Sequence, residues 1–132
     1  MRIVVRYSET DAMKFVYYAN YLVYFEVART SALAALGHPY WEMEKNNVLI
    51  PVLAARCEYL KPGKYGDDLL LSTLRWRIGP ARIRFDYEVR RGDDLLARGQ
   101  TEHAFMHPQG HPIRPPKDII GLFPDWPGDD GT

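Results

Sequence analysis

The chain has 132 residues, of which 46% are hydrophobic, so it can fill one ordinary core and is too short for a second independent domain. Its 17 Lys and Arg residues balance 17 Asp and Glu residues, which argues against an overall field that recruits nucleic acid or an anionic membrane. The single cysteine, Cys57, excludes an internal disulfide.

The first part of the chain predicts a strand, a loop and one long helix. Residues 2–7 are mostly β-branched or aromatic and favour a strand, and the polar residues 8–14 favour a loop. Residues 17–36 contain neither Gly nor Pro, carry apolar side chains around most of a helical circumference, and are followed by Gly37. We therefore expect a helix over 17–36 that is buried on most sides.

The rest of the chain predicts a short helix or turn at 39–46 and then strands at 53–60, 69–78, 81–90 and 95–106. In 81–90 apolar residues alternate with charged ones, which indicates a strand with one wet face. The fold class is therefore α+β, an antiparallel sheet of about five strands wrapped around one long central helix. We expect a single domain over 1–123 and a disordered tail over 124–132, which is rich in Pro, Gly and Asp.

Asp11 is the candidate for chemistry because it lies just ahead of the predicted helix. A helix start presents unpaired N–H groups and a partial positive charge, which can bind the oxygen of a thioester carbonyl. An ionised aspartate could then attack the carbonyl carbon or deprotonate a water, without metal or histidine. The alternative is that Asp11 only forms turn and capping hydrogen bonds.

Two short runs surround the start of the predicted helix: Arg6-Tyr7-Ser8-Glu9-Thr10-Asp11-Ala12 and Val16-Tyr17-Tyr18-Ala19-Asn20-Tyr21. They closely resemble the signature of the 4-hydroxybenzoyl-CoA thioesterase family, whose members have the hotdog fold. Residues 58–62, 65–67 and 95–104 also look like family segments in the expected order, so the resemblance spans roughly residues 2–123.

The resemblance implies that Asp11 is the catalytic carboxylate and that the backbone N–H of Tyr18 polarises the thioester carbonyl. It also implies that Val16 and Tyr17 contact substrate, and that Asn20 and Tyr21 support the helix start. Many relatives have glycine at the position of Lys14 and histidine at that of Tyr18. The family further implies a homodimer whose sheets join, with pockets between subunits, and a homotetramer formed as a dimer of dimers.

Coenzyme A carries phosphates, so Arg82 and Arg84 on the wet strand face are candidates to bind it, as are Lys61 and Lys64. The alternative is that this strand face is simply solvated. We expect no cofactor and no metal, because His103 and His107 on one strand face have no evident third ligand.

The predicted function is hydrolysis of acyl- or aryl-CoA thioesters, with no nucleic-acid partner and no stable membrane insertion. One alternative is a non-catalytic module that binds acyl ligands, with Asp11 only structural. A hotdog-fold enoyl-CoA hydratase is disfavoured because no histidine lies in the Asp11 loop. The start of the chain lacks a signal peptide and no stretch approaches the roughly 18 apolar residues of a membrane span, so we expect a cytoplasmic location.

Overall fold

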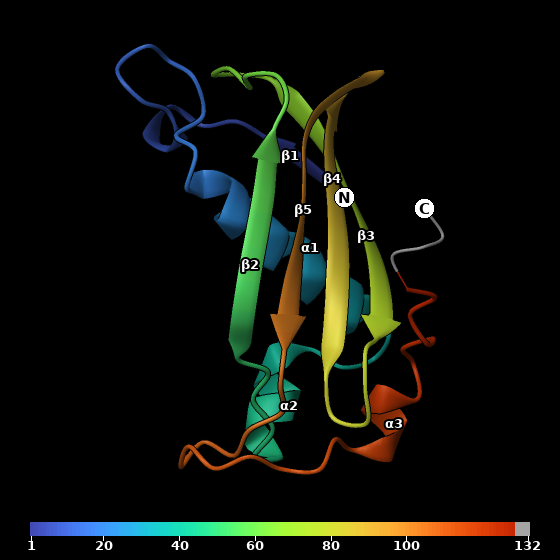
Figure 1. Cartoon of the computed structure of the whole chain (residues 1–132). Helices are drawn as coiled ribbons and strands as arrows, with labels where there is room; N and C mark the ends of the chain where they lie inside the picture. The colour runs from blue at the N-terminus through green and yellow to red at the C-terminus, as the bar shows by residue number, and fades with distance from the viewer. Residues whose placement is uncertain (129–132) are drawn as a thin grey trace.

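The computed structural model describes residues 1–128 and consists of one antiparallel sheet crossed on one face by a long helix (Figure 1). The strands are β1 (Arg2–Val4), β2 (Val52–Tyr59), β3 (Asp68–Arg77), β4 (Ile83–Arg91) and β5 (Asp94–His103), in the order β1-β3-β4-β5-β2. The helix is α1 (Asn20–Ala35). This architecture confirms the predicted α+β class and the five antiparallel strands around one helix.

The core lies between α1 and the sheet because the apolar faces of both elements meet there. Tyr21, Tyr24, Phe25 and Ala28 of α1 are buried, and the ring of Phe25 stacks on that of Tyr87 with centroids 4.4 Å apart. On β4 the alternation predicted from the sequence is confirmed, since four alternate residues face the core: Ile83, Phe85, Tyr87 and Val89.

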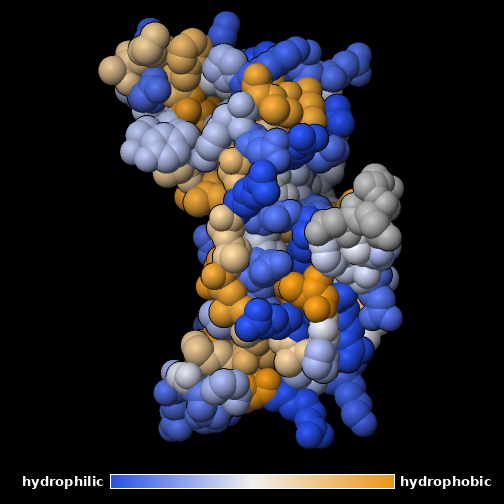
Figure 2. Space-filling view, in the orientation of Figure 1, coloured by the Kyte–Doolittle hydropathy of each residue, from blue (hydrophilic) through white to orange (hydrophobic). Residues whose placement is uncertain are grey.

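The opposite face of the sheet is polar and faces the viewer in Figure 2, where blue side chains dominate over the central strands. The side chains between the buried positions of β4 lie there and are only partly exposed: Arg84, Asp86, Glu88 and Arg90. A sheet covered on one face only produces this split between an apolar and a charged side.

α1 begins later than predicted, at Asn20 instead of residue 17. The preceding turn is built from i to i+3 bonds, in which Asn20 N–H donates to Tyr17 O (2.8 Å) and Tyr21 N–H to Tyr18 O (3.2 Å). At the other end, Gly37 has a φ of 93°, and His38 N–H donates to Leu33 O, so the helix ends where the glycine predicted.

The two ends of the sheet carry different structures (Figure 1). At one end lie the loop before α1, the β2–β3 connection and the β4–β5 turn. At the other lie the C-terminal end of α1, the β3–β4 turn, α2 (Tyr40–Lys45) and α3 (Lys117–Ile120). α2 shows that the short helix or turn expected at 39–46 is a helix, and α3 was not expected.

The prediction that His103 and His107 share a strand face is wrong, because β5 ends at His103 and not at residue 106. His103 is fully buried, whereas the His107 ring stacks on that of His111, with centroids 4.6 Å apart. His107 lies in a turn that its own backbone closes, since its N–H donates to His111 O and its carbonyl accepts from Gly110 N–H.

Sheet contacts continue past residue 123, where a disordered tail was expected. Arg77 N–H donates to Pro124 O (2.7 Å), Trp126 N–H donates to Arg77 O (2.9 Å), and the Trp126 ring lies under the Arg84 guanidinium at 4.5 Å. These contacts fix residues 124–126, while 129–132 lie outside the described residues. Within 1–128, no helix has the length and apolarity that a membrane crossing requires.

Candidate active site

The loop around Asp11 is folded by the aspartate itself. Asp11 Oδ1 accepts hydrogen bonds from the backbone N–H of Met13 (2.9 Å) and of Phe15 (3.2 Å), and Asp11 N–H donates to Phe15 O (2.8 Å). This is the turn-forming role proposed as the alternative to catalysis. It occupies one carboxylate oxygen only. Oδ2 makes no hydrogen bond to residues 1–128, and the side chain is exposed, so this oxygen is available for chemistry.

Backbone bonds join the Asp11 loop to the start of α1. The carbonyl of Glu9 accepts from Tyr17 N–H (2.9 Å) and from Asn20 Nδ2 (2.9 Å), and Thr10 pairs with Val16 across the loop. Asn20 thus supports the helix start, as its place in the motif implied. The Glu9 side chain adds a further tie by accepting from the Tyr24 hydroxyl (3.2 Å), a contact that the sequence did not reveal.

Tyr18 lies in the turn immediately ahead of α1, with its side chain 60% exposed. Its carbonyl accepts from Tyr21 N–H (3.2 Å) and from the Tyr59 hydroxyl (3.1 Å). Its N–H has no acceptor within the described part of the chain. An unpaired N–H at the positive end of a 16-residue helix is a donor suited to an oxygen that gains negative charge.

A pocket of about 290 Å³ opens beside Tyr18. Its lining is mainly apolar and aromatic: Val16, Tyr18, Tyr21, Tyr59, Leu60, Lys61 and Pro62. Tyr17 lies next to it, with its ring 4.8 Å from that of Tyr18. Asp11 does not line this pocket in the single chain, so the structure places Val16, Tyr17 and Tyr18 together, with Asp11 joined to them through the loop.

Two phenols shape this pocket, Tyr21, which is buried, and Tyr59, which is only partly covered. The Tyr21 hydroxyl accepts from Gly63 N–H (3.2 Å), and burial raises the pKa of Tyr21. Burial also raises the pKa of Tyr59 to about 12, so its hydroxyl keeps the proton that it donates to Tyr18 O. Both phenols are therefore neutral hydrogen-bonding groups and not bases at physiological pH.

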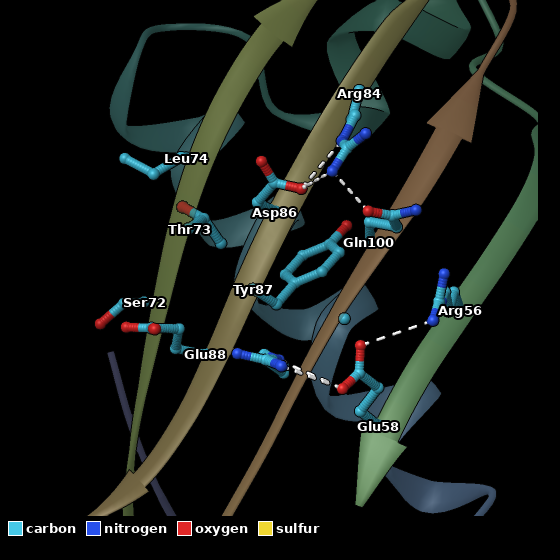
Figure 3. A pocket seen from close by; sticks show the side chains of 12 residues that line it. Arg56, Glu58, Ser72, Thr73, Leu74, Arg84, Asp86, Tyr87, Glu88 and Gln100 are labelled. Carbon is cyan, nitrogen blue, oxygen red and sulfur yellow. Dashed lines mark hydrogen bonds and ion pairs between the residues drawn. The ribbon is translucent and has the colours of Figure 1, made fainter. Parts of the chain in front are cut away.

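Arg82 and Arg84 lie at the other end of the sheet from the Asp11 loop, next to the β3–β4 turn. Arg84 points onto the outer face, where its guanidinium contacts Asp86 (2.8 Å) and Gln100 (Figure 3). That face carries a hollow of about 460 Å³ in which Glu58 also pairs with Arg56 and Arg98. The charges of this hollow neutralise one another. Because Arg82 and Arg84 lie at the opposite end of the sheet from the Asp11 loop, a single chain does not bring them to the candidate site.

Lys14 and Lys64 are the cations nearest to the Asp11 loop that have no carboxylate within 4.0 Å in the described chain. They lie side by side because Phe15 pairs with Lys64, and Tyr65 N–H donates to Lys14 O (3.0 Å). Lys61, the other lysine candidate, is paired with Asp94 at 2.9 Å. Lys14 has a φ of 65°, a backbone conformation that explains why a glycine suits this position.

No histidine accompanies Asp11 in space, and all four histidines are among the described residues. His38 follows α1 and His103 ends β5, while His107 and His111 form the next turn, all at the opposite end of the sheet. The aspartate–histidine pair of a hotdog hydratase is therefore missing from this chain's Asp11 loop in three dimensions as well as in sequence.

The order of loop, long helix and antiparallel sheet defines a hotdog protein, and the comparisons assign its family. The sequence profile of the Thioesterase superfamily matches residues 13–98, so the chain belongs to the Thioesterase superfamily. The matched residues include Tyr18 and the whole of α1 but not Asp11.

Relatives with names or structures agree with this assignment. The Bacillus subtilis protein named "Putative acyl-CoA thioesterase YneP" is 36% identical over 94% of this chain and 88% of its own length. A 1,4-dihydroxy-2-naphthoyl-CoA hydrolase of Synechococcus elongatus is 31% identical over 80% of this chain and 79% of its own. The solved DHNA-CoA thioesterase of Staphylococcus aureus superposes with a TM-score of 0.82 at 32% identity, covering 86% of this chain and 78% of that one. The chain is thus a thioester hydrolase with the hotdog fold.

Proposed function

We propose that this chain hydrolyses acyl- or aryl-CoA thioesters at Asp11 and Tyr18. The observation that carries the proposal is the pairing of an unengaged backbone donor, Tyr18 N–H, with a carboxylate that keeps Oδ2 free. Both lie on the hydrogen-bonded loop that precedes α1, which the contact of Glu9 with Asn20 and the pairing of Thr10 with Val16 hold together. The names of the relatives support coenzyme A thioesters as the substrate class.

In the proposed reaction the thioester carbonyl oxygen accepts a hydrogen bond from Tyr18 N–H, which stabilises the negative charge of the tetrahedral intermediate. Asp11 either removes a proton from the attacking water or attacks the carbonyl carbon itself. In both routes the carbon–sulfur bond breaks, coenzyme A leaves as the thiolate, and the acyl group departs as the free acid. In the second route, water hydrolyses the acyl–aspartyl anhydride.

A single turnover in ¹⁸O-labelled water identifies direct attack when the anhydride is hydrolysed at its aspartyl carbonyl, because ¹⁸O then remains in the Asp11 carboxylate and the released acid is unlabelled. General-base catalysis places ¹⁸O in the released acid and none in Asp11, and so does hydrolysis of an anhydride at its acyl carbonyl.

Lys14 and Lys64 are the residues that we propose for the coenzyme A phosphates, in preference to Arg82 and Arg84. Their support is position, since they flank the Asp11 loop and have no carboxylate partner in residues 1–128. Lys14→Asn retains tolerance for positive φ while removing the charge, and it should raise KM for CoA thioesters about 5-fold. If Arg82→Gln raised KM by this factor and Lys14→Asn left KM unchanged, the phosphates would instead be assigned to the strand face that carries Arg82 and Arg84.

We infer that two copies of the chain associate through β2. It is an edge strand with exposed Val52 and Leu53, and the outward side of α1 adds exposed Leu22 and Val23 beside it. Leu53→Lys should shift the molecular mass in light scattering toward a single chain. An unchanged mass would contradict association at this edge, and a mass of four chains in the wild type would support a dimer of dimers.

The deciding experiment measures thiol release from short, long and aromatic CoA thioesters by the wild type and by Asp11→Asn. Hydrolysis predicts release by the wild type and a loss of at least about 100-fold in kcat for the variant, with ligand binding retained. Asp118→Asn on α3, at the opposite end of the sheet, is the matched control and should behave as wild type.

The same panel separates the alternatives. No thiol release by a folded wild type that still binds CoA thioesters would favour the binding module. Loss of the enoyl absorbance of an enoyl-CoA, without thiol release, would favour hydration.

A further inference from the structure

Arg29 is a buried cation on α1 that the proposed reaction does not use. Its exposed fraction is 7%. Its Nε donates to the Tyr40 hydroxyl (3.3 Å) and its Nη1 to the Tyr87 hydroxyl (3.5 Å), both at the long end of hydrogen-bond distances. A guanidinium has five N–H donors, so most of the donor capacity of Arg29 is not engaged by these two phenols.

Arg29 is buried, yet no carboxylate lies within 4.0 Å of it among the described residues. More exposed arginines do have such partners, as in the pairs Arg91 with Asp67 (2.8 Å) and Arg98 with Glu58 (3.1 Å). A buried charge is costly to desolvate unless an opposite charge or several acceptors compensate it. Nη2 of Arg29 has no hydrogen-bond partner among residues 1–128 and is not fully buried, so it is open to an acceptor from outside this part of the chain.

Arg29 also lines a cavity of about 210 Å³ between α1 and the edge strand β2. The walls are mostly apolar, and the full lining is Leu22, Val23, Glu26, Arg29, Val52, Ala55 and Thr101. The Thr101 hydroxyl is already engaged by the Tyr87 hydroxyl (2.6 Å) and by His103 Nε2 (2.7 Å). Glu26, the other charged residue of the lining, is exposed, so Arg29 is the buried charge of this cavity.

The spacing along α1 connects this cavity with the candidate active site. Leu22, Glu26 and Arg29 follow Tyr18 at intervals of four, four and three residues, which places them on one side of the helix. The 11 residues from Tyr18 to Arg29 correspond to roughly 16 Å along the axis. A group bound at Tyr18 by its thioester carbonyl can therefore extend along this side of α1, over the apolar Leu22, toward Arg29.

We propose that Arg29 binds an oxygen acceptor at the far end of the acyl or aryl group, and that it favours substrates whose distal oxygen is anionic, such as a carboxylate. This inference rests on the proposed hydrolysis at Asp11 and Tyr18. Leu22, Val23 and Val52 lie at the edge of the proposed contact between two copies, so the acyl group binds at that contact with its hydrocarbon part against these residues. The guanidinium compensates the distal charge through charge-assisted hydrogen bonds.

The competing explanation is that the acceptor comes from a second copy of the chain. Glu26 is exposed and has no cation within 4.0 Å in residues 1–128, and it lies on the same side of α1. If Glu26 of one copy compensates Arg29 of the other, then Arg29 determines association and not substrate choice.

The test compares pairs of CoA thioesters that have equal chain length, from about 6 to 12 carbons to match the ~16 Å of helix, with and without a terminal carboxylate. For the wild type and for Arg29→Gln, the measured quantity is the ratio of kcat/KM for the carboxylated substrate to that for its plain partner. We expect Arg29→Gln to lower this ratio at least about 10-fold at the best chain length, and Arg29→Lys to lower it less. Arg2→Gln, a distant exposed arginine, should leave the ratio unchanged.

A ratio that stays within about twofold in Arg29→Gln would overturn the proposal, as would a loss of the dimer in light scattering with an unchanged ratio. If Arg29→Gln does not fold, the proposal is tested by comparing the same kcat/KM ratio, carboxylated over plain substrate, between Arg29→Lys and the wild type. A wild type that prefers the plain substrate more than about 100-fold at every length overturns the proposal. Thiol release from none of the thioesters would instead refute the proposed hydrolysis itself, and this inference with it.

Discussion

The Tyr59 hydroxyl donates a hydrogen bond to the backbone carbonyl of Tyr18 at 3.1 Å, joining the last residue of β2 to the turn that opens α1. The Tyr59 ring also meets the rings of Tyr18 and Tyr21 edge to face, at 6.2 Å and 5.4 Å. Tyr59 thereby holds the residue whose N–H is the proposed oxyanion donor. It is a positioning residue, since its hydroxyl acts on the backbone of Tyr18 and not on the thioester.

Removing this hydroxyl should impair turnover more than stability. For Tyr59→Phe we expect kcat to fall about 5-fold with little change in KM, because a hydrogen bond worth ~1 kcal/mol no longer fixes the Tyr18 backbone during the reaction. The measurement is steady-state thiol release together with the midpoint of thermal unfolding. Tyr65→Phe is the control, as the Tyr65 ring packs against Tyr7 but contacts neither Tyr18 nor its pocket. Equal kcat in the two variants would remove Tyr59 from the positioning of the site.

The sequence predicted those parts of the fold that follow from local periodicity. The alternation from Ile83 to Val89 identified the buried face of β4, and Gly37 identified the end of α1. The start of α1 was misplaced because Tyr17 and Tyr18 have apolar rings that continue the helical pattern, although their backbone forms an i to i+3 turn. Periodicity reports which side chains are apolar, and it does not report which hydrogen bonds the backbone makes.

The sequence predicted only those residues of the candidate site that lie in one continuous segment of the chain. Asp11 and Tyr18 belong to a single motif, whereas the bond from Tyr59 joins residues 41 positions apart and has no local signal. Arg29 is a charged residue in a mostly apolar helical segment, and the structure buries it against Tyr40 and Tyr87. Such contacts depend on how α1 crosses the sheet, and a local stretch of sequence carries no information about this packing.

Lys14 holds a left-handed backbone conformation in the Asp11 loop, with a φ of 65° and its N–H donating to Asp11 O (2.9 Å). For a residue with a Cβ this conformation costs roughly 1 kcal/mol, and more with branching at Cβ. Lys14→Gly should therefore change the free energy of unfolding by less than about 0.5 kcal/mol, as relief of strain offsets the greater freedom of the unfolded chain. Lys14→Val should lose about 1–2 kcal/mol.

Urea denaturation measures both variants, with Lys45→Val as the control in the last turn of α2, where φ is not positive. The control should lose less than about 0.7 kcal/mol, the span of helix propensity. Equal losses for valine at positions 14 and 45 would contradict the assignment of strain to Lys14.

Gly99 allows α1 to approach the sheet, because a Cβ there would overlap the Arg56 carbonyl oxygen and lie 2.5 Å from the Phe25 ring. The carbonyl belongs to the β2 backbone paired with β5, so it cannot move aside without breaking the ladder. Gly99→Ala should lower the free energy of unfolding by about 3 kcal/mol or more. Gly79→Ala is the matched control, since nothing lies within 4 Å of its Cβ position, and its stability should change by less than about 1 kcal/mol. A mild effect of Gly99→Ala would mean that β2 and α1 can separate at this point.

His103 makes stability depend on pH at the end of the sheet remote from the site. Burial, and secondarily the charge of Arg29, lower the pKa of His103 to about 4, below the value near 6.5 of an unfolded histidine. Between these values the unfolded chain binds the proton and the folded chain does not, so stability is full above about pH 6.5 and falls as the pH drops toward 4. At pH 4.5 the loss from this residue should be ~2.5 kcal/mol.

His103→Gln isolates this effect from the carboxylates that titrate in the same range. Near pH 7 the variant should be less stable than the wild type, because it loses the bond between His103 Nε2 and the Thr101 hydroxyl (2.7 Å). As the pH falls to about 4.5, the difference between the two unfolding free energies should shrink by ~2.5 kcal/mol, since only the wild type gains a proton at this position on unfolding. Urea denaturation at intervals across this range measures the difference. A difference that stays constant would show that the pKa of His103 is the same in the folded and the unfolded chain, so that its burial does not resist protonation.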